Sequence, residues 1–270
     1  MMNTWSMTRF AATIAACMGA EAPRLADGPL EMVTGYARRQ LRGPARRALI
    51  YNPDCIGHWF WQAHSDLLAP AQVRAPLAVP LSTVMPAVTP VCFGTMYTGA
   101  MPEVHGIRAY EKPVIHIDSL LDSLPRSGKR VALVAVEDSS MAKIFAGRDV
   151  DYHIMPDDAA AVRRGAELIR ADAHDAVIVY NQEYDDMIHA TTPGSEAAIA
   201  AAGRHVEAFA RLADAAAEAW RDHPSIVVWA PDHGCHTDWD GHGNHGEFRD
   251  EDINVIHLFG ALPERTDRDA

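Results

Sequence analysis

Near the C-terminus, the stretch DHGCHTDWDGHGNHG (232–246) contains three aspartates and four histidines. Its four glycines predict irregular backbone rather than a helix. Neighbouring aspartate and histidine side chains are costly in a folded chain unless water or a cation satisfies them. Two interpretations follow from composition alone, a solvated polar turn and a metal site.

A calcium loop of the EF-hand type can be tested directly on this stretch. If Asp238 is position one, Gly243 falls correctly at position six, but His242 occupies position five and Arg249 position twelve. Calcium requires oxygen ligands at those two places, so this assignment fails. Imidazole nitrogens mixed with carboxylates suit zinc or a similar transition metal better.

Carboxylates also follow the ends of three apolar runs. RALIYNPD ends on Asp54, AVIVYNQEYDD reaches Asp185, and SIVVWAPDH ends on Asp232 and His233. In an open α/β sheet, ligands bind beyond the carboxyl ends of the strands. A single aspartate at a strand end is commonly a helix cap or a turn residue. Three of them, accompanied by histidines, predict a common site at one edge of a sheet.

The spacing of the remaining candidates supports a grouping of ligands. Asp185 and His189 are four residues apart, so on a short helical turn they share one face. His245 returns from the far end of the glycine-rich loop. The other polar residues nearby are interpreted as ordinary: Asp186 as an outward or supporting group, and His236 and His242 as satisfied surface or core histidines.

The elements needed to position these residues can be predicted from the pattern. Short β-rich runs occur at 47–52, 131–136, 151–155, 176–180, 225–230 and 254–260, and helical patterns occur at 57–68, 117–124, 157–171 and 195–223. Continuous apolar strands alternating with helices predict the α/β class, with a mostly parallel central sheet covered by helices on both faces. The proline-rich stretch 75–90 is interpreted as an irregular approach to the site.

Length and charge bound the organisation and the partners. The 270 residues predict a single domain (1–270), with an N-terminal helical extension at about 1–46 and a core at about 47–260. The net charge of −12 argues against a nucleic-acid polymer or an anionic membrane as the main partner. A small anionic substrate remains compatible, because bound cations reverse the local field. The oligomeric state is not predicted.

The cysteines indicate the compartment. Four cysteines without a CxxC pair suggest free thiols and therefore a reducing, cytoplasmic environment. The apolar run FAATIAACMGA after Arg9, followed by Ala-Glu-Ala, also fits a signal peptide over residues 1–22. An amphipathic N-terminal helix explains the run as well, and we favour that interpretation.

Four blocks, in this order, resemble the alkaline phosphatase superfamily, specifically its nucleotide pyrophosphatase/phosphodiesterase-like branch. The blocks are YNPDCIG, TPVCFGTMYTGAMPEVHGI, EYDDMIH, and PDHG followed by GNHG. The second block is the most specific, because Thr89, the Thr98-Gly99 pair and PEVHG keep the spacing of the nucleophile helix in that branch. The resemblance spans about residues 47–260 and implies that these residues form an alkaline phosphatase-like metal-hydrolase core without a large cap.

The resemblance implies two divalent metal ions, with zinc expected and manganese or iron as alternatives. One ion would be held by Asp185, His189 and His245. The other would be held by Asp54, Asp232, His233 and the oxygen of Thr89, which would also be the nucleophile. Two cations about 4 Å apart favour ionisation of a hydroxyl and stabilise the attacking and leaving oxygens at phosphorus.

Three departures from the family pattern affect the expected substrate. Where related diesterases place an asparagine about 21 residues after the nucleophile, this chain has Tyr110, whose hydroxyl replaces the amide donor unless the ring only packs. Lys112 is the alternative source of a substrate contact. Only eleven residues separate His233 from His245, which leaves no room for a cap domain and predicts an open site. Cys92 lacks the sulfatase context and is interpreted as a buried structural thiol.

The leading hypothesis is therefore a two-metal phosphoester hydrolase, either a phosphodiesterase or a nucleotide pyrophosphatase. The alternative on the same fold is a phosphomonoesterase or phosphonate hydrolase, for which Lys112 or Lys143 would contact the additional charged oxygens. A non-catalytic metal-binding module is the third possibility. The presence of Thr89 argues against it, because a pure binder has no need of a hydroxyl at that position.

Overall fold

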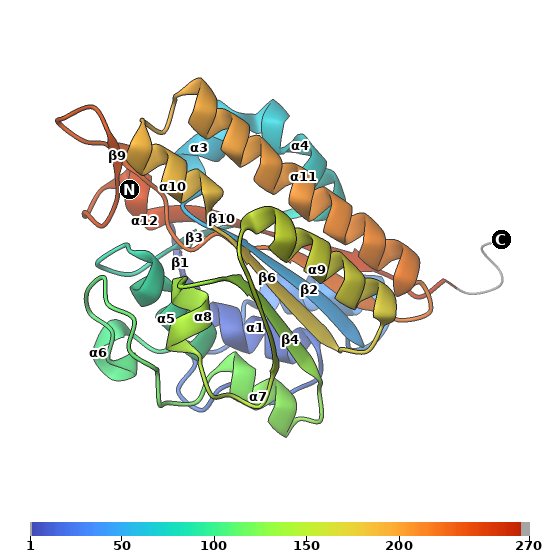
Figure 1. The fold of residues 1–270 in the computed structure, drawn as a ribbon. Helices are drawn as coiled ribbons and strands as arrows, with labels where there is room; N and C mark the ends of the chain where they lie inside the picture. The colour runs from blue at the N-terminus through green and yellow to red at the C-terminus, as the bar shows by residue number, and fades with distance from the viewer. Residues whose placement is uncertain (1, 266–270) are drawn as a thin grey trace.

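The computed structural model describes residues 2–265, and its centre is a sheet of eight strands in the order β1-β3-β10-β7-β2-β6-β4-β5 (Figure 1). The strands of this sheet are β1 (Trp5–Ser6), β2 (Arg47–Pro53), β3 (Leu77–Ser82), β4 (Val131–Val136), β5 (Asp151–Met155), β6 (Ala176–Asn181), β7 (Ser225–Trp229) and β10 (Asn254–Leu262). Only β10 runs antiparallel to its neighbours, and the remaining pairs are parallel. The predicted α/β class with a mostly parallel sheet is confirmed.

The strand residues alternate between two apolar layers. On β2, Ala48 and Ile50 pack into one layer, whereas Leu49 and Tyr51 pack into the other. Both faces are buried because successive side chains of a strand point to opposite sides of the sheet. This explains why the central strands read as continuous apolar runs in the sequence.

Helices cover both faces of the sheet (Figure 1). The first face carries α1 (Phe10–Cys17), α2 (Glu31–Leu41), α5 (Thr89–Thr98), α7 (Leu120–Arg126) and α8 (Ser140–Ile144). The second face carries α3 (His58–Ala63), α4 (Ser65–Arg74), α9 (Asp158–Ala171), α10 (Glu183–Ala190) and α11 (Glu196–Ala219). The short elements η1 (Met7–Arg9), α6 (Pro102–His105), α12 (Asp250–Ile253), β8 (His236–Thr237) and β9 (Gly243–Asn244) lie in the connections.

The N-terminal segment is part of the packed core. Phe10, Ala11 and Ile14 of α1 are fully buried, and β1 adds an edge strand next to β3. The region named an extension in the sequence therefore contributes directly to one layer of the fold. No helix within residues 2–265 has the length and apolarity required to cross a membrane.

The stretch 75–90 contains a strand that the sequence pattern did not predict. Leu77–Ser82 forms β3, although Pro80 interrupts it. Proline lacks a backbone donor and is tolerated near sheet edges. Here β3 is the second strand of the sheet, and only the short β1 lies beyond it. The prediction of irregular backbone was therefore wrong for residues 77–82. The rest of the stretch leads directly into α5.

Two loops that leave the carboxyl edge approach each other at glycines. A Cβ on Gly234 would lie 2.0 Å from the carbonyl oxygen of Glu251 and 2.8 Å from the Cα of Gly57. The loop after Asp54 and the loop after His233 can therefore touch only because neither has a side chain at the crossing. This close approach brings the ends of β2 and β7 together at one site.

Candidate metal centre

Six side chains at the carboxyl edge of the sheet form two groups, each with three possible ligand atoms within 4.8 Å of one another. The first group is Asp185, His189 and His245, and the second is Asp54, Asp232 and His233. These are the two ligand sets that the family resemblance implied from the sequence. The structure brings together every predicted side-chain ligand.

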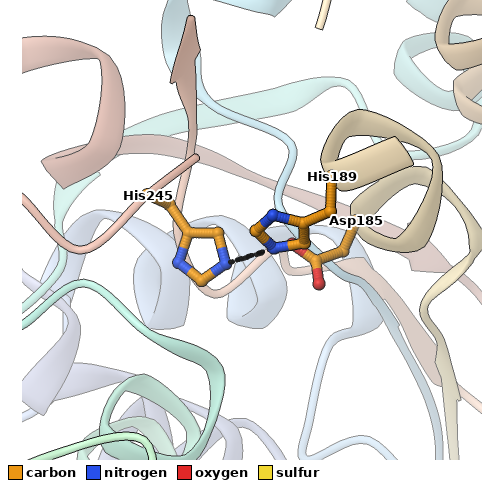
Figure 2. Close-up of side chains that lie close together, drawn as sticks. All are labelled: Asp185, His189 and His245. Atoms are coloured by element: carbon orange, nitrogen blue, oxygen red, sulfur yellow. Dashed lines mark hydrogen bonds and ion pairs between the residues drawn. The ribbon is translucent and has the colours of Figure 1, made fainter. Parts of the chain in front are cut away.

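The first group joins α10 to the returning loop, and Figure 2 shows its three side chains converging. Asp185 Oδ1 lies 3.6 Å from His189 Nε2 and 3.3 Å from His245 Nε2, and the two imidazole nitrogens are 3.1 Å apart. The side chain of His189 is 44% exposed, whereas that of His245 is 5% exposed. This group therefore opens toward solvent on the α10 side.

Local structure holds both halves of this group. The Asp158 carboxylate accepts the backbone N–H groups of Gln182 and Glu183 at 3.0 and 2.8 Å, which caps the start of α10. The β8–β9 pair folds the loop back on itself. A Cβ on Gly243 would lie 2.7 Å from the Ile188 carbonyl oxygen, so glycine lets the loop contact α10 and places His245 beside His189.

The second group is deeply buried. His233 Nε2 lies 3.4 Å from Asp54 Oδ1 and 3.4 Å from Asp232 Oδ2, and the side chains of all three residues are at most 2% exposed. Thr89 is the first residue of α5, and its Oγ1 lies 3.4 Å from Asp54 Oδ2 and 3.3 Å from His233 Nε2. The hydroxyl therefore faces the ligand atoms of this group.

The three histidines are oriented by the backbone. The Nδ1–H of His189 donates to Gly243 at 3.1 Å, that of His233 to Gly234 at 3.0 Å, and that of His245 to Ala87 at 3.0 Å, each time to a carbonyl oxygen. A protonated Nδ1 leaves the lone pair on Nε2. All three Nε2 atoms face the two carboxylate clusters, which is the arrangement of metal-binding imidazoles with supporting hydrogen bonds.

The carboxylates supply the strongest indication of bound cations. Within residues 2–265, Asp54 Oδ1, Asp185 Oδ1 and Asp232 Oδ2 are buried and have no hydrogen-bond partner. Buried carboxylate oxygens are normally paired, because an isolated buried charge is very costly. A divalent cation in each group would satisfy these oxygens. Mixed nitrogen and oxygen donors fit zinc, manganese or iron rather than calcium.

The pKa values of the ligands in the metal-free protein reflect the close packing of buried carboxylates and imidazoles. Burial raises the pKa of Asp232 to about 7 and, reinforced by Asp232 and Asp185, raises the pKa of Asp54 well above its usual range. Burial lowers the pKa of His233 to about 3, so its imidazole is neutral at pH 7. Burial opposes ionisation of Asp185 as well, but the neighbouring imidazoles of His245, His233 and His189 outweigh it and hold that pKa at about 2.

These shifts predict how pH affects the metal-free protein. Asp54 and Asp232 have folded-state pKa values above their ordinary value of 3.8. Their protonation therefore favours folding below pH 4, and this contribution is lost as the pH rises through about 7. Thermal unfolding in chelator should show a melting temperature that falls between pH 5 and pH 8.

Zinc should remove most of this dependence of the melting temperature on pH, because the cation replaces the protons on Asp54 and Asp232. Asp232→Asn, measured in chelator, is the matched control and should also flatten the dependence on pH. An equal slope with and without zinc would contradict the assignment of these carboxylates to a metal site.

Sequence reasoning missed Tyr180, the last but one residue of β6. Its hydroxyl donates to Asp54 Oδ2, the same oxygen that Thr89 contacts. Tyr180 is opposite Asn52 in the register of β2 and β6, so its side chain and Asp54 lie on the same face of the sheet. The sequence places Tyr180 near a strand end, but only the register shows that it supports a ligand.

A cavity of about 220 Å³ opens beside the two groups and is lined by Asp54, Thr89 and Asp185 together with Tyr110, Lys112 and Asp186, among others. The predicted substrate contacts Tyr110 and Lys112 therefore reach the site. Tyr110 is 62% exposed. The Lys112 ammonium donates to the Asp138 carbonyl at 2.9 Å and lies 5.5 Å from the centre of the Tyr110 ring.

The residues interpreted as ordinary have the expected surroundings. His236 is buried and lies 2.7 Å from the Asp252 carboxylate, outside both ligand groups. His242 is exposed on the returning loop. Cys92 is a buried free thiol that accepts a hydrogen bond from Thr83 at 2.9 Å. Asp186 accepts a hydrogen bond from Gln182 at 3.2 Å and faces the cavity rather than the ligands.

Comparisons with known proteins place the fold. No family model matches the sequence. A search of curated proteins also finds no match. Solved structures do match, at low sequence identity, and the likeness therefore concerns the fold.

Human ectonucleotide pyrophosphatase/phosphodiesterase 5 matches with a TM-score of 0.59 and 14% identity, over 79% of this chain and 87% of that one. The periplasmic domain of a phosphoethanolamine transferase from Campylobacter jejuni matches with a TM-score of 0.56 and 13% identity, over 80% of each chain.

Phosphonoacetate hydrolase from Sinorhizobium meliloti 1021, in complex with phosphonoformate, matches with a TM-score of 0.52 and 16% identity. The match covers 76% of this chain, which spans about 60% of the length of that hydrolase. Together these neighbours confirm the fold that the resemblance of the four sequence blocks implied. The chain has the fold of the alkaline phosphatase superfamily, including its nucleotide pyrophosphatase/phosphodiesterase-like members.

Proposed function

We propose that the protein is a two-metal phosphoester hydrolase in which Thr89 is the nucleophile, and that its substrates are phosphodiesters or nucleotide pyrophosphates. One observation carries the proposal. Three buried carboxylate oxygens, on Asp54, Asp185 and Asp232, have no hydrogen-bond partner within residues 2–265, and the Thr89 hydroxyl lies 3.4 Å from Asp54 beside the cavity that Asp54, Thr89 and Asp185 line. A site that only stores metal has no use for a hydroxyl in that position.

Bound divalent cations would supply positive charge that lowers the pKa of a neighbouring hydroxyl and stabilises phosphoryl oxygens. The chain supplies the orientation. Thr89 is only 3% exposed and occupies the first turn of α5, where the positive end of the helix dipole favours an anionic group. Tyr180 holds the Asp54 carboxylate in place through the oxygen that also contacts Thr89.

Structural neighbours support the proposal by their chemistry. One is an inactive threonine-to-alanine variant of murine ectonucleotide pyrophosphatase/phosphodiesterase 5 in complex with AMP, with a TM-score of 0.54 and 16% identity over 71% of this chain and 58% of that one. Another is the C-terminal periplasmic domain of a related transferase from Escherichia coli in complex with zinc, with a TM-score of 0.55 and 12% identity over 80% of this chain and 73% of that one. The first agrees with a threonine that is required for activity, and the second agrees with zinc as the cofactor.

Metal content and turnover test this function together. Protein purified without chelator should contain about two transition-metal ions per chain, with zinc expected from the mixed ligand set. It should hydrolyse small aryl phosphoesters, and the rate should decrease below roughly pH 6 as protons compete for the imidazole ligands. Elemental analysis that finds no metal, with none rebinding on titration, would refute the site assignment.

The open cavity predicts the preferred ester. Without a cap, binding energy comes mainly from the phosphoryl group and the metals, so discrimination among leaving groups should be weak. Tyr110 offers one neutral donor, which suits a singly charged diester better than a dianionic monoester. A clear preference for monoesters or phosphonates would instead favour the alternative function, in which Lys112 contacts the additional oxygen.

Replacing Tyr110 with phenylalanine tests its predicted role. The Tyr110 hydroxyl lines the cavity and has no hydrogen-bond partner among residues 2–265, so it is free to donate to a substrate oxygen. Tyr110→Phe should lower kcat/KM for an aryl diester by roughly ten- to a hundredfold. Unchanged steady-state kinetics would show that the hydroxyl makes no contact with the substrate.

The four cysteines bear on the compartment. All are buried and none is in a disulfide. On this ground we propose that the protein is cytoplasmic. Its proposed substrate is a small phosphorylated molecule. Buried free thiols are typical of reducing surroundings.

A further inference from the structure

A second cavity, of about 270 Å³, lies on the face of the sheet where α9 and α11 pack side by side over β2 and β6 (Figure 1). It shares no lining residue with the cavity beside the metal centre. Its buried lining includes Tyr51 of β2, Asn181 of β6 and His205 of α11, and exposed arginines surround its mouth. The volume far exceeds what one water molecule requires, so a small organic molecule fits.

One backbone donor fixes the proton positions in the buried part of this cavity. The Tyr184 N–H, in the first turn of α10, donates to His205 Nε2 at 3.1 Å. A ring nitrogen that accepts a hydrogen bond has no proton, and burial lowers the pKa of His205, so the single ring proton is on Nδ1. His205 Nδ1 lies 2.9 Å from the Tyr51 hydroxyl and is therefore the donor of that bond.

This arrangement leaves the hydroxyl hydrogen of Tyr51 without an acceptor. Among residues 2–265, His205 is the only hydrogen-bond partner of the Tyr51 oxygen, and it donates to that oxygen. Tyr51 is fully buried, and buried polar groups are normally hydrogen-bonded. The cavity therefore contains a buried donor that an entering acceptor would satisfy.

Asn181 presents the complementary group to the same cavity. It is 1% exposed, and its Nδ2 donates to the Asp158 carbonyl oxygen at 3.1 Å, which fixes the orientation of the amide. Its Oδ1 is buried and has no hydrogen-bond partner in the described part of the chain. Val179 is opposite Tyr51 in the register of β2 and β6, so Asn181, two residues further on, lies on the same face as Tyr51.

A single alcohol group would satisfy both of these buried groups. A hydroxyl accepts from the Tyr51 O–H and donates to Asn181 Oδ1. A carboxylate has no proton to donate to Asn181, and an ammonium group has no lone pair for Tyr51. The buried part of the cavity therefore favours a hydroxyl over a charged group.

The mouth of the cavity has the opposite preference. No hydrogen bond or ion pair engages the side chain of Arg163 or Arg211 within residues 2–265, whereas Arg204 is bound by both oxygens of Glu183 at 2.8 and 2.7 Å. Glu207 is the unpaired carboxylate among these described lining residues, so two guanidinium groups and one carboxylate leave a net charge of +1. Guanidinium groups bind carboxylates and phosphates through paired, charge-assisted hydrogen bonds.

We infer that this cavity binds a small organic anion that carries an alcohol group. The alcohol would bridge Tyr51 and Asn181, and the anionic group, a carboxylate or a phosphate, would lie at Arg163 and Arg211. This site is separate from the metal centre, and the inference does not depend on the proposed hydrolytic function.

Two pairs of nearly isosteric ligands test the alcohol requirement. L-Malate and 2-methylsuccinate differ by a hydroxyl in place of a methyl group, as do 3-hydroxypropyl phosphate and butyl phosphate. Zinc-loaded Thr89→Ala protein, in which the esters should remain intact, would be titrated calorimetrically with each ligand. We expect about tenfold tighter binding of the hydroxylated member in at least one pair, because its analogue leaves the buried donor and acceptor unpaired. The pair with the larger ratio identifies the anionic group.

Variants at the mouth test the location. Arg163→Gln should weaken binding of the preferred ligand about fivefold. Arg170→Gln, the same change of charge on an exposed residue of α9 that does not line the cavity, is the matched control and should leave the affinity unchanged. Equal weakening by the two variants, or none by Arg163→Gln, would show that the anion binds elsewhere and would overturn the inference.

Tyr51→Phe tests the buried part of the site. It should reduce the ratio of the two dissociation constants in the preferred pair to about one, and circular dichroism would verify that the variant is folded. A crystal structure with the preferred ligand should show its hydroxyl between Tyr51 and Asn181. Water alone in the cavity, or equal binding within both pairs by the parent protein, would overturn the inference whatever the stability of Tyr51→Phe.

Discussion

Thr89→Ala is expected to lower phosphoester turnover by at least about a thousandfold, because the substitution removes the attacking oxygen itself. The fold and the metal content should remain. Thr89 contributes its hydroxyl at 3.4 Å from Asp54, whereas the buried metal group keeps Asp54, Asp232 and His233 as ligands. Steady-state kinetics and elemental analysis of the same preparation measure both quantities.

Thr89→Ser is the matched control for this prediction. Serine keeps an oxygen at the same place, so it should restore a substantial part of the activity that alanine removes. Mass spectrometry after rapid acid quenching should detect a phosphoryl group on residue 89 in the active protein. Near-normal turnover by Thr89→Ala would exclude nucleophilic attack by this residue and favour direct attack by water.

Asp54→Ala is expected to reduce the metal content from about two ions to about one and the rate by several thousandfold. The carboxylate is 1% exposed; one of its oxygens has no hydrogen-bond partner within residues 2–265, and the other contacts Tyr180 and Thr89. Its loss removes a metal ligand and also the group that orients the nucleophile. His245→Ala should remove the other ion with a comparable loss of rate.

His242→Ala provides the control on the same loop. His242 is three residues before His245, is exposed and belongs to neither ligand group. Its variant should keep two ions and full activity. Loss of metal from His242→Ala would show that the loop is assigned in the wrong register. Retention of two ions by Asp54→Ala would exclude this carboxylate as an essential ligand.

Much of the fold followed from local pattern. The continuous apolar runs that became β2, β4, β6 and β7 were visible because strands buried on both faces have no polar alternation. The helix at 195–223 was visible from its Ser195 cap and apolar periodicity, and it forms α11. By contrast, β3 was hidden by Pro80, since proline is a strong local signal against a strand whatever its neighbours are.

The ligands were predictable for a related reason. Parallel strands deliver their carboxyl ends to one edge of the sheet, so Asp54 and Asp232 were expected at the same edge. The strand order, in which β2 and β7 are neighbours, then places them side by side. The four-residue spacing of Asp185 and His189 is likewise a local property of a helical turn. The resemblance to the superfamily added His245 and Thr89, which no local rule connects to the other ligands.

The sequence by itself therefore determined the fold class, the edge that carries the site and the chemical types of the ligands. Tertiary structure alone decided which side chains support them. Strand register places Tyr180 against Asp54, and the packing of loops at Gly234 and Gly243 sets which histidine nitrogen faces the centre. It also brings Tyr51 and Asn181 to the wall of one cavity. Local propensities act over a few residues, whereas these contacts join segments far apart in the chain, whose positions depend on the packing of the whole core.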